Sequence, residues 1–403
     1  MCYQNYKLKD QLITLLLVVV CSTGCKKNDS NIPSGRIDNV LIDGGTSAGF
    51  QRIIGGIKLD NLCSVKQTKD GGYIFCGFTE NEGASERDVL LLRTNNKGEK
   101  IWVKKLSDKY TDQGWHIEIT SDNGYIIAAT STISAANTGD NRYGGQLIKT
   151  DSNGNQQWKK TYGAEGYNQL STVRQTTDGG FIASSSEYGN HISYLLKTDE
   201  LGNESWKKAL GSFVEVSFVD KTHDGGFILC GSIQLNIAAP RNGYVIRTNS
   251  TGDTLWTKTF VNPYENKIAA IKETADGNFI LCGYNANSND IFGFARLINS
   301  TGEQLWNSDF SNLNIDVLDY INITNDNQFI AVGRQSFGST TKAYLQKIDI
   351  NGKSLWVKSF NPGTYNLFSE VQQTTDNGFI LAGYSISYGN VNAYIVKTGP
   401  DGN

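Results

Sequence analysis

The chain has 403 residues, a formal net charge of −3 and a charged fraction of 19%. Such a balance excludes the basic surface expected of a nucleic-acid-binding protein, and an aromatic fraction of 11% excludes a disordered chain. With 43 glycines but only 5 prolines, the composition indicates many tight turns between short strands. At roughly 150 residues per domain the length alone predicts two or three domains, an expectation that an internal repeat overrides.

The first 24 residues have the features of a secretory signal. A short basic start precedes an apolar run over residues 12–20. As a helix this run is too short to span a bilayer, for which ~20 residues are needed, and it fits the apolar core of a signal peptide. It leads into Ser-Thr-Gly-Cys, ending at Cys25. This stretch resembles the lipobox of bacterial lipoproteins, although Ser22 stands where that family usually has an aliphatic residue.

The lipobox resemblance implies cleavage before Cys25 and a diacylglycerol group on its sulfur. The protein would then be an outer membrane lipoprotein, on the cell-surface or the periplasmic side, with residues 25–49 as its tether and lead-in. Several acyl chains anchor firmly, because each buried CH₂ contributes ~0.8 kcal/mol. An ordinary cleaved signal with an incidental cysteine is the alternative.

The rest of the chain repeats one pattern seven times. The segment Thr-x-Asp-Gly-Gly-Tyr-Ile at residues 68–74 recurs at intervals of 46–56 residues. Its Thr and Ile are present in every copy, and the residue before Ile is always Tyr or Phe. The repeated aspartates are Asp70, Asp122, Asp178, Asp224, Asp276, Asp326 and Asp376. A tryptophan lies 18–20 residues before six of them, at Trp102, Trp158, Trp206, Trp256, Trp306 and Trp356, and Phe50 takes this place in the first copy.

Each copy is predicted to form four strands. In the second copy residues 114–121, 125–130, 146–150 and 157–159 alternate in polarity and are separated by turns rich in Asp, Asn and Gly, which is the pattern of β-hairpins. A four-stranded antiparallel unit of about 50 residues is the blade of a β-propeller. The last copy lacks its tryptophan strand, so residues 50–54 are predicted to supply it. The sequence therefore predicts an all-β, monomeric, seven-bladed propeller over residues 50–403.

Two family resemblances bear on the repeated residues. Thr-x-Asp-x-Gly-x-Ile resembles the Asp-box of sialidase-like propellers, which implies that the seven aspartates cap turns and are structural. Lys-Thr-Asp-x-x-Gly-x-x-x-Trp, as at residues 149–158, resembles the repeat of quinoprotein propellers, which implies that Trp packs between blades. The eight repeats, vicinal cysteines and calcium site of that cofactor family are not visible, so no cofactor is predicted.

The cysteines indicate neither a metal site nor a disulfide framework. Cys76, Cys230 and Cys282 occupy the same position of three repeats, where a small buried side chain is expected. Cysteines in separate blades cannot bridge one another, which leaves only a pairing of Cys63 with Cys76 open. No C-x-x-C spacing supports zinc.

One row of polar residues varies between the copies. It lies in the first strand of each copy and its charges alternate through five of them; this channel ring is Lys66, Glu118, Arg174, Asp220, Lys272, Asn322 and Gln372. The ring either pairs charges between neighbouring blades, which would fix their order, or lines a central channel that binds a ligand.

Aromatic residues outside the repeat pattern fall in the loops. The loops between the second and third strands, and between the tryptophan strand and the next copy, are expected to open on one face. Predicted ligand contacts on this face are Trp115, Tyr110, Tyr143, Tyr167, Tyr264 and Tyr365. Aromatic rings near Asn and Asp suit sugars and protein partners, and packing that anchors the loops is the alternative.

The whole repeat region resembles the DGG[YF]I-repeat propeller lipoproteins of Bacteroidetes-like bacteria. Fold alone does not define activity, and no catalytic motif is present around the three histidines. A non-catalytic lipoprotein that binds a glycan or a protein is the first hypothesis. The alternative is a glycoside hydrolase or lyase that uses Glu118 with Asp220, or Glu370, in the channel, where a hydrolase needs two carboxyls roughly 5–9 Å apart.

Overall fold

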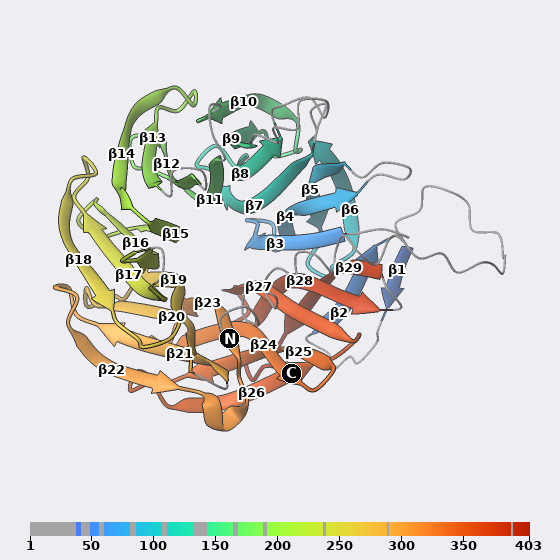
Figure 1. Ribbon diagram of the computed structural model, residues 1–403. Coiled ribbons are helices and arrows are strands. Elements are labelled where there is room, and N and C mark those ends of the chain that lie inside the picture. Colours follow the sequence, from blue (N-terminus) through green and yellow to red (C-terminus); the bar gives the residue numbers. More distant parts are fainter. Residues whose placement is uncertain are drawn as a thin grey trace. The chain divides into compact units, whose positions relative to one another are not determined.

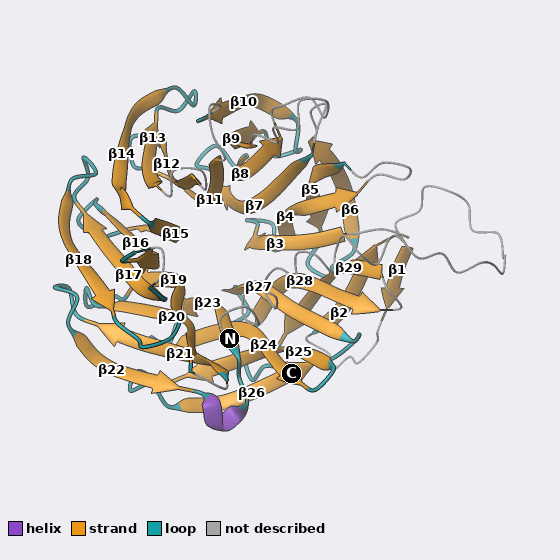
Figure 2. Ribbon diagram, in the orientation of Figure 1, coloured by secondary structure: helices purple, strands orange, loops and turns teal. Residues whose placement is uncertain are grey.

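The computed structural model describes residues 38–41, 49–55, 60–80, 86–106, 111–132, 143–163, 168–187, 192–236, 239–287, 290–387 and 390–403. They form strands almost throughout, with one short 3-10 helix among them, η1 (Ser311–Leu313) (Figure 2). The chain is therefore all-β, as its sequence predicts. Residues 39–403 form one compact unit. In this described part no helix is long and apolar enough to cross a membrane.

Five four-stranded antiparallel sheets follow one another, each with its strands in sequence order. The first three comprise β3 (Asp60–Gln67), β4 (Tyr73–Glu80), β5 (Arg87–Thr94) and β6 (Lys100–Leu106); β7 (Asp112–Ile119), β8 (Tyr125–Thr132), β9 (Tyr143–Thr150) and β10 (Gln156–Tyr162); and β11 (Asn168–Gln175), β12 (Phe181–Glu187), β13 (Ile192–Thr198) and β14 (Glu204–Ser212). The next two comprise β15 (Val214–Lys221), β16 (Phe227–Gln234), β17 (Arg241–Thr248) and β18 (Thr254–Phe260); and β19 (Asn266–Glu273), β20 (Phe279–Ala286), β21 (Ile291–Ile298) and β22 (Gln304–Asp309).

The remaining strands form a nine-stranded sheet. They are β1 (Asp38–Leu41), β2 (Phe50–Gly55), β23 (Val317–Ile323), β24 (Phe329–Phe337), β25 (Thr340–Ile348), β26 (Ser354–Phe360), β27 (Tyr365–Gln373), β28 (Phe379–Ser387) and β29 (Asn390–Thr398). Strands β23 to β26 and strands β27 to β29 are two antiparallel groups, joined by one parallel bridge between Thr341 and Tyr365. Strand β2 lies antiparallel to β29, with Phe50 opposite Lys397. An early strand thus pairs with the last one.

Successive sheets and strand groups follow one another around a common centre (Figure 1). The second strand of each contacts the first strand of the next: β4 with β7, β8 with β11, β12 with β15, β16 with β19, β20 with β23, β24 with β27, and β28 with β3. The first strands also contact one another in turn, from β3 through β27 and back to β3. The first strand of each copy is therefore the innermost one.

The repeated aspartates cap the hairpins between first and second strands. Asp122 accepts hydrogen bonds from the Thr120 hydroxyl and from the backbone N–H of Gly124 (3.0 Å), and it pairs with Lys149 Nζ (2.8 Å). A Thr hydroxyl donates to the aspartate in all seven copies. In the fifth copy, where the sequence departs from Gly, the Asn278 side chain donates to Asp276 (2.8 Å). Each carboxylate thus has partners within its own sheet.

The tryptophans pack between sheets. Trp102 contacts Tyr125 of the next sheet with ring centroids 6.4 Å apart. The following sheet's turn approaches so closely at Gly154 (φ 74°) that a Cβ there would lie 2.7 Å from the Trp102 ring, which explains why glycine stands in this turn. Equivalent aromatic pairs occur seven times, at Phe50–Tyr73, Trp102–Tyr125, Trp158–Phe181, Trp206–Phe227, Trp256–Phe279, Trp306–Phe329 and Trp356–Phe379.

The cysteines of the described residues are all free thiols. Cys76, Cys230 and Cys282 are buried and Cys63 is half-buried. The pairing of Cys63 with Cys76 that the sequence left open is therefore not formed. Burial raises the pKa of the Cys63 thiol to about 12, so it has little thiolate character at neutral pH.

Candidate functional site

Each sheet has a hairpin side and a loop side. On the hairpin side tight turns join the first strand to the second and the third to the fourth. On the loop side lie the connections between second and third strands and those to the next sheet. This alternation follows from the antiparallel strand order, and it places the aspartate turns and the aromatic loops at opposite ends of every sheet.

The innermost strands share an irregularity. Each is shifted in register by one residue against its neighbour, at Cys63, Trp115, Ser171, Ser217, Ala269, Asp319 and Ser369. The residue after each shift is buried; this central layer is Ser64, His116, Thr172, Phe218, Ala270, Tyr320 and Glu370. Phe218 of β15 contacts Tyr320 of β23, past the intervening β19, with ring centroids 5.7 Å apart. Side chains of the central layer thus meet between non-adjacent sheets.

The channel ring lies two residues further along, toward the hairpin side. Six of its members, together with Gln67, Tyr320 and Glu370, line a cavity of about 290 Å³: Lys66, Glu118, Arg174, Lys272, Asn322 and Gln372. Asp220, the seventh, bonds to two of them. The structure therefore brings together the residues that the sequence placed in one ring.

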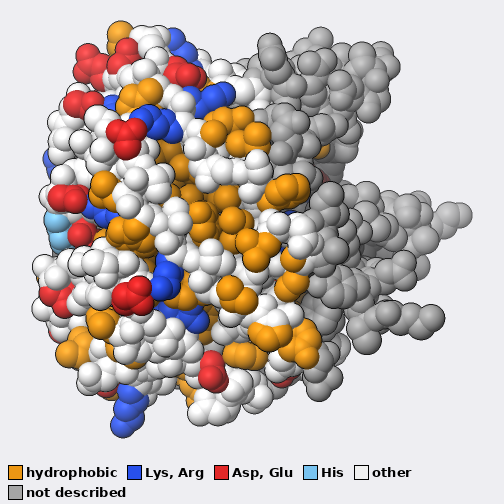
Figure 3. Space-filling model, turned by 60° about the vertical axis from the view of Figure 1, so that its left-hand side comes forward, with side chains coloured by type: hydrophobic (Ala, Val, Ile, Leu, Met, Phe, Trp, Pro, Cys, Tyr) orange, Lys and Arg blue, Asp and Glu red, His pale blue; other side chains and the backbone are white. Residues whose placement is uncertain are grey.

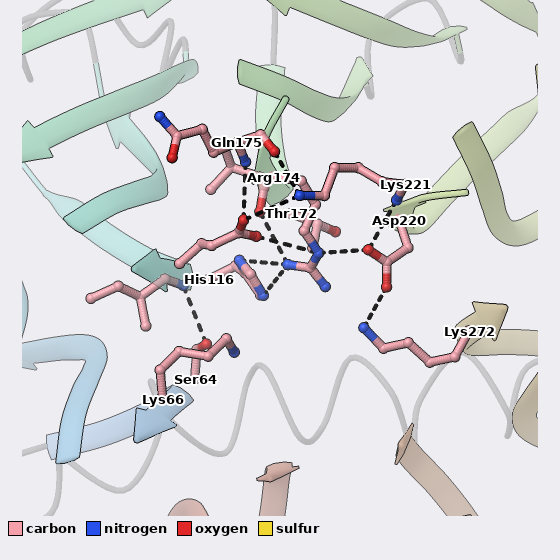
Figure 4. A network of polar contacts seen from close by, with 12 residues as sticks. Ser64, Lys66, His116, Thr172, Arg174, Gln175, Asp220, Lys221 and Lys272 are labelled. Atoms are coloured by element: carbon pink, nitrogen blue, oxygen red, sulfur yellow. Dashed lines mark hydrogen bonds and ion pairs between the residues drawn. The ribbon is translucent and has the colours of Figure 1, made fainter. Parts of the chain in front are cut away.

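Ion pairs link the ring across sheet boundaries (Figure 4). Arg174 Nε lies 2.9 Å from Asp220 Oδ1 and 3.5 Å from Glu118 Oε2, so β11 is tied to both neighbours, β15 and β7. Lys272 Nζ pairs with the second oxygen of Asp220. Lys66 pairs with Glu370, and so joins β3 to β27. The positive charges of Lys66, Arg174 and Lys272 are therefore balanced by negative ones. These belong to Glu118, Asp220 and Glu370.

These pairs fix the protonation of two carboxylates. Burial by itself raises the pKa of Asp220, but the nearby charges of Lys272 and Arg174 outweigh it and lower that pKa well below its usual range. At Glu370 burial is likewise outweighed by Lys66, and the pKa is lowered. Both groups are ionised at neutral pH and hold no proton for a glycosidic oxygen, whereas a catalytic acid needs a raised pKa.

His116 is the buried histidine of the central layer. Its Nε2 accepts a hydrogen bond from Arg174 Nη1 (2.6 Å). Burial, and then the charge of Arg174, lower the pKa of His116 well below the ordinary value, so its imidazole stays neutral in the folded protein. The unfolded chain binds a proton here below about pH 6.5, and this stabilises the unfolded state as the pH falls.

We therefore expect the melting temperature of the wild type to fall between about pH 7 and pH 5, with a smaller fall in His116→Asn. Circular dichroism melts at several pH values measure this. The exposed His223 provides the control, because His223→Asn leaves the buried group in place. A wild-type profile identical to that of His116→Asn would contradict the assignment.

Two of the predicted loop-side aromatics are packed. Trp115 is half-buried, donates from Nε1 to Thr130 Oγ1 (2.9 Å) and contacts Phe78 edge-on at 5.8 Å. Tyr365 stacks on Tyr384 at 5.9 Å. These contacts fit the alternative that the aromatics anchor loops. Tyr110, Tyr167 and Cys25 lie outside the described residues.

Tyr264 and Tyr143 are exposed to 45% and 36%. Tyr264 lies in the loop from β18 to β19, and its backbone N–H donates to Asn262 Oδ1 (3.1 Å). The Asn262 backbone N–H donates to Asn242 Oδ1 (2.8 Å), and its side chain donates to Asn285 Oδ1 (3.4 Å). Exposed aromatic surface and a group of amide side chains thus meet at one place on the loop side.

Isolated apolar side chains also reach solvent on the outer strands. The residue before the tryptophan is exposed in several sheets, with Leu255 at 57% and Leu305 at 52%. Single exposed residues of this kind are ordinary on soluble proteins and define no site. Figure 3 looks onto the side with β14, β18 and β22 and shows apolar side chains together in the middle of the view, with most of the charged ones around them.

The sequence missed part of the cavity lining. Tyr320 and Gln67 were not singled out, although both belong to first strands already aligned by the repeat. The sequence does carry a signal for this lining in the central layer, two residues before the channel ring. There Glu370, His116 and Tyr320 stand where other copies have small residues. The register shift that orients this row has no mark in the sequence.

Comparison with known proteins finds solved structures of similar fold but no matching family. No family model and no curated protein matches the chain. Among solved structures, polysaccharide lyase Uly1 has a TM-score of 0.53 at 10% identity, covering 84% of this chain and 90% of that one. A streptogramin B lyase has a TM-score of 0.52 at 11% identity, covering 87% and 97%. A protein from Lactobacillus plantarum has a TM-score of 0.52 at 11% identity, covering 79% and 94%.

At such identities the likeness concerns the fold alone. The similar structures are propeller-like, and they agree with the sheets packed in succession around a centre. The chain is therefore an all-β protein with a β-propeller fold.

Proposed function

We propose that this chain is a non-catalytic binding protein of the bacterial cell envelope, which presents a glycan site on the loop side of a seven-bladed propeller. The observation that carries the proposal is the contrast between the two ends of the sheets. On the hairpin side, charges that could perform chemistry are paired with one another. On the loop side an exposed tyrosine lies beside amide side chains.

Seven blades over residues 50–403 are part of this proposal. The seven aromatic pairs between sheets support it, because Phe50 and Tyr73 repeat at one boundary the contact that Trp102 and Tyr125 make at another. The contacts of β28 and β27 with β3 also support it. In this arrangement β2 completes the blade of β27 to β29, so the ring has no open boundary.

The envelope location rests on the leader. A signal over residues 1–24, a lipid on Cys25 and a tether to residue 49 would hold the propeller at the outer membrane. The resemblance to DGG[YF]I-repeat lipoproteins supports the same location and extends over the whole repeat region.

A glycan is the ligand that the loop-side chemistry favours. The face of the Tyr264 ring can pack on the apolar C–H face of a sugar. The half-buried amide of Asn262, held by the buried Asn285, provides a donor and an acceptor for hydroxyl groups. A few placed polar groups beside an apolar surface are the usual composition of a small-ligand site.

A glycan array with the secreted propeller tests the proposal. We expect Tyr264→Ala to weaken binding about tenfold or more, equivalent to ~1.4 kcal/mol, because it removes the stacking ring without touching the core. Leu255→Ala is the matched control, since its side chain is also exposed, but on an outer strand. The proposal fails if no glycan is bound, or if Tyr264→Ala binds as the wild type does.

A carbohydrate-active enzyme is the alternative, because Glu118 and Asp220 flank Arg174, which lines the central cavity with Glu118. The lowered pKa of Asp220 and the pairing of the carboxylates leave no identified acid. Two of the similar structures are lyases by name, but resemblance at this level does not transfer activity. Turnover of a bound glycan would favour this alternative.

A further inference from the structure

A second cavity, of about 450 Å³, opens on the hairpin side between β2 and the first sheet. Its size is within the range of small-molecule pockets, ~300–1,000 Å³. Its lining includes Phe50, Arg52, Tyr73, Asn96, Lys97, Asp376 and Lys397. Asp376 pairs with Lys397 (2.9 Å) and is neutralised by it.

The cavity lies at the one sheet boundary where, among the described residues, phenylalanine takes the place of the indole ring. At two other boundaries the ring N–H donates to the backbone carbonyl of the second residue in the next turn: Trp256 to Ser300 (3.0 Å) and Trp306 to Ile350 (2.9 Å). Asn96 occupies the same turn position as Ser300, one residue after the asparagine that opens the turn. Phe50 has no N–H to offer, and among the described residues no donor reaches the Asn96 carbonyl.

Two cations without carboxylate partners border the cavity. Arg52 donates to the carbonyls of Gln51 (3.2 Å) and Lys97 (3.3 Å), and its guanidinium lies 5.1 Å from the Phe50 ring centre. Lys97 is exposed at the turn tip. Within the described part of the chain neither forms an ion pair. At the corresponding place of other boundaries the cation is engaged by a side chain, as Lys358 is by Asn403 (2.7 Å).

We propose that this cavity is a binding site for an aromatic carboxylate whose ring carries an N–H donor, such as an indole carboxylate. The ring packs in the cavity beside Phe50, whose own ring takes the place that an indole has elsewhere. Its N–H donates to the Asn96 carbonyl, and its carboxylate meets Arg52 and Lys97. This site is on the opposite side of the propeller from Tyr264 and is independent of the glycan proposal.

Isothermal titration of the propeller with indole-3-acetate tests the site. We expect saturable binding with a dissociation constant on the order of 0.1–1 mM. Tryptamine, which carries a cation in place of the carboxylate, should bind at least about tenfold more weakly, and so should phenylacetate, which lacks the ring N–H.

Phe50→Trp is the decisive variant, because the larger indole extends from the position of Phe50 into the cavity. We expect it to lose indole-3-acetate binding while its melting temperature rises by a few degrees. Lys97→Gln changes an exposed turn and should weaken binding several-fold with no loss of stability. Lys358→Gln, at an equivalent boundary, should bind like the wild type.

The proposal is overturned by any of three results. The first is a titration with indole-3-acetate that shows no saturable binding heat up to about 10 mM ligand. The second is an affinity for tryptamine equal to that for indole-3-acetate, and the third is unchanged indole-3-acetate binding in a folded Phe50→Trp protein. Glycan binding should be the same in Phe50→Trp and wild type, so failure of one site leaves the other measurable.

Discussion

Arg174→Met is expected to be among the most destabilising single substitutions in this protein. The guanidinium is 5% exposed and holds Asp220 and Glu118 on neighbouring strands. Removing one partner of a buried ionic group leaves uncompensated charge and costs about 3–5 kcal/mol. Urea unfolding followed by tryptophan fluorescence measures the loss.

Two further variants test whether the loss of stability comes from the buried charges. Lys221→Met is the control, because its amine lies 3.9 Å from Glu118, is 42% exposed and should cost no more than about 1 kcal/mol. Adding Glu118→Gln to Arg174→Met should recover part of the stability, since it removes the orphaned carboxylate while Asp220 keeps Lys272 as its partner. An Arg174→Met protein as stable as Lys221→Met would show that the ring does not hold the sheets.

Removal of β2 is expected to have the second large effect. A chain that starts at residue 57 loses the pairing of Phe50 with Lys397 and the hydrogen bond from the Tyr394 hydroxyl to Gln51 Oε1 (2.7 Å). It also loses the Phe50–Tyr73 contact between sheets. The exposed β29 edge then invites association between molecules. We expect a fall in melting temperature of at least about 10 °C and oligomers on size-exclusion chromatography.

A chain that starts at Gly49 is the matched control and should behave as the mature protein does. A synthetic peptide of residues 49–57 should restore part of the melting temperature when added to the shortened chain. If both chains melt together and both are monomeric, β2 does not close the ring.

The regular part of the fold could be read from the sequence because the repeat keeps side chains in register. The aspartate hairpins, the tryptophan boundaries and the channel ring each fall at one position of every copy. Fixed spacing is enough to place Lys66, Glu118 and Arg174 around one centre without knowing any contact. The partners of each charge depend on sheet twist and side-chain reach, and only the structure shows these.

The irregular features could not be read in this way. Trp115 is the tryptophan outside the register, and its indole N–H donates to Thr130 on the adjacent strand, a contact that the repeat pattern does not indicate. The register shifts of the innermost strands change which residue faces the centre, and no residue type marks them. Phe218 and Tyr320 meet between non-adjacent sheets, a contact that no periodic argument within one copy includes.

The most direct test of the account compares the two ends of the propeller in one binding experiment. The glycan with the strongest signal is titrated into wild type, Tyr264→Ala and Gln372→Ala, with its integrity checked afterwards by mass spectrometry. We predict that Tyr264→Ala loses about tenfold or more in affinity, that Gln372→Ala binds as the wild type does, and that the glycan is recovered intact. Loss of binding in Gln372→Ala with none in Tyr264→Ala, or cleavage of the glycan, would contradict a non-catalytic loop-side site.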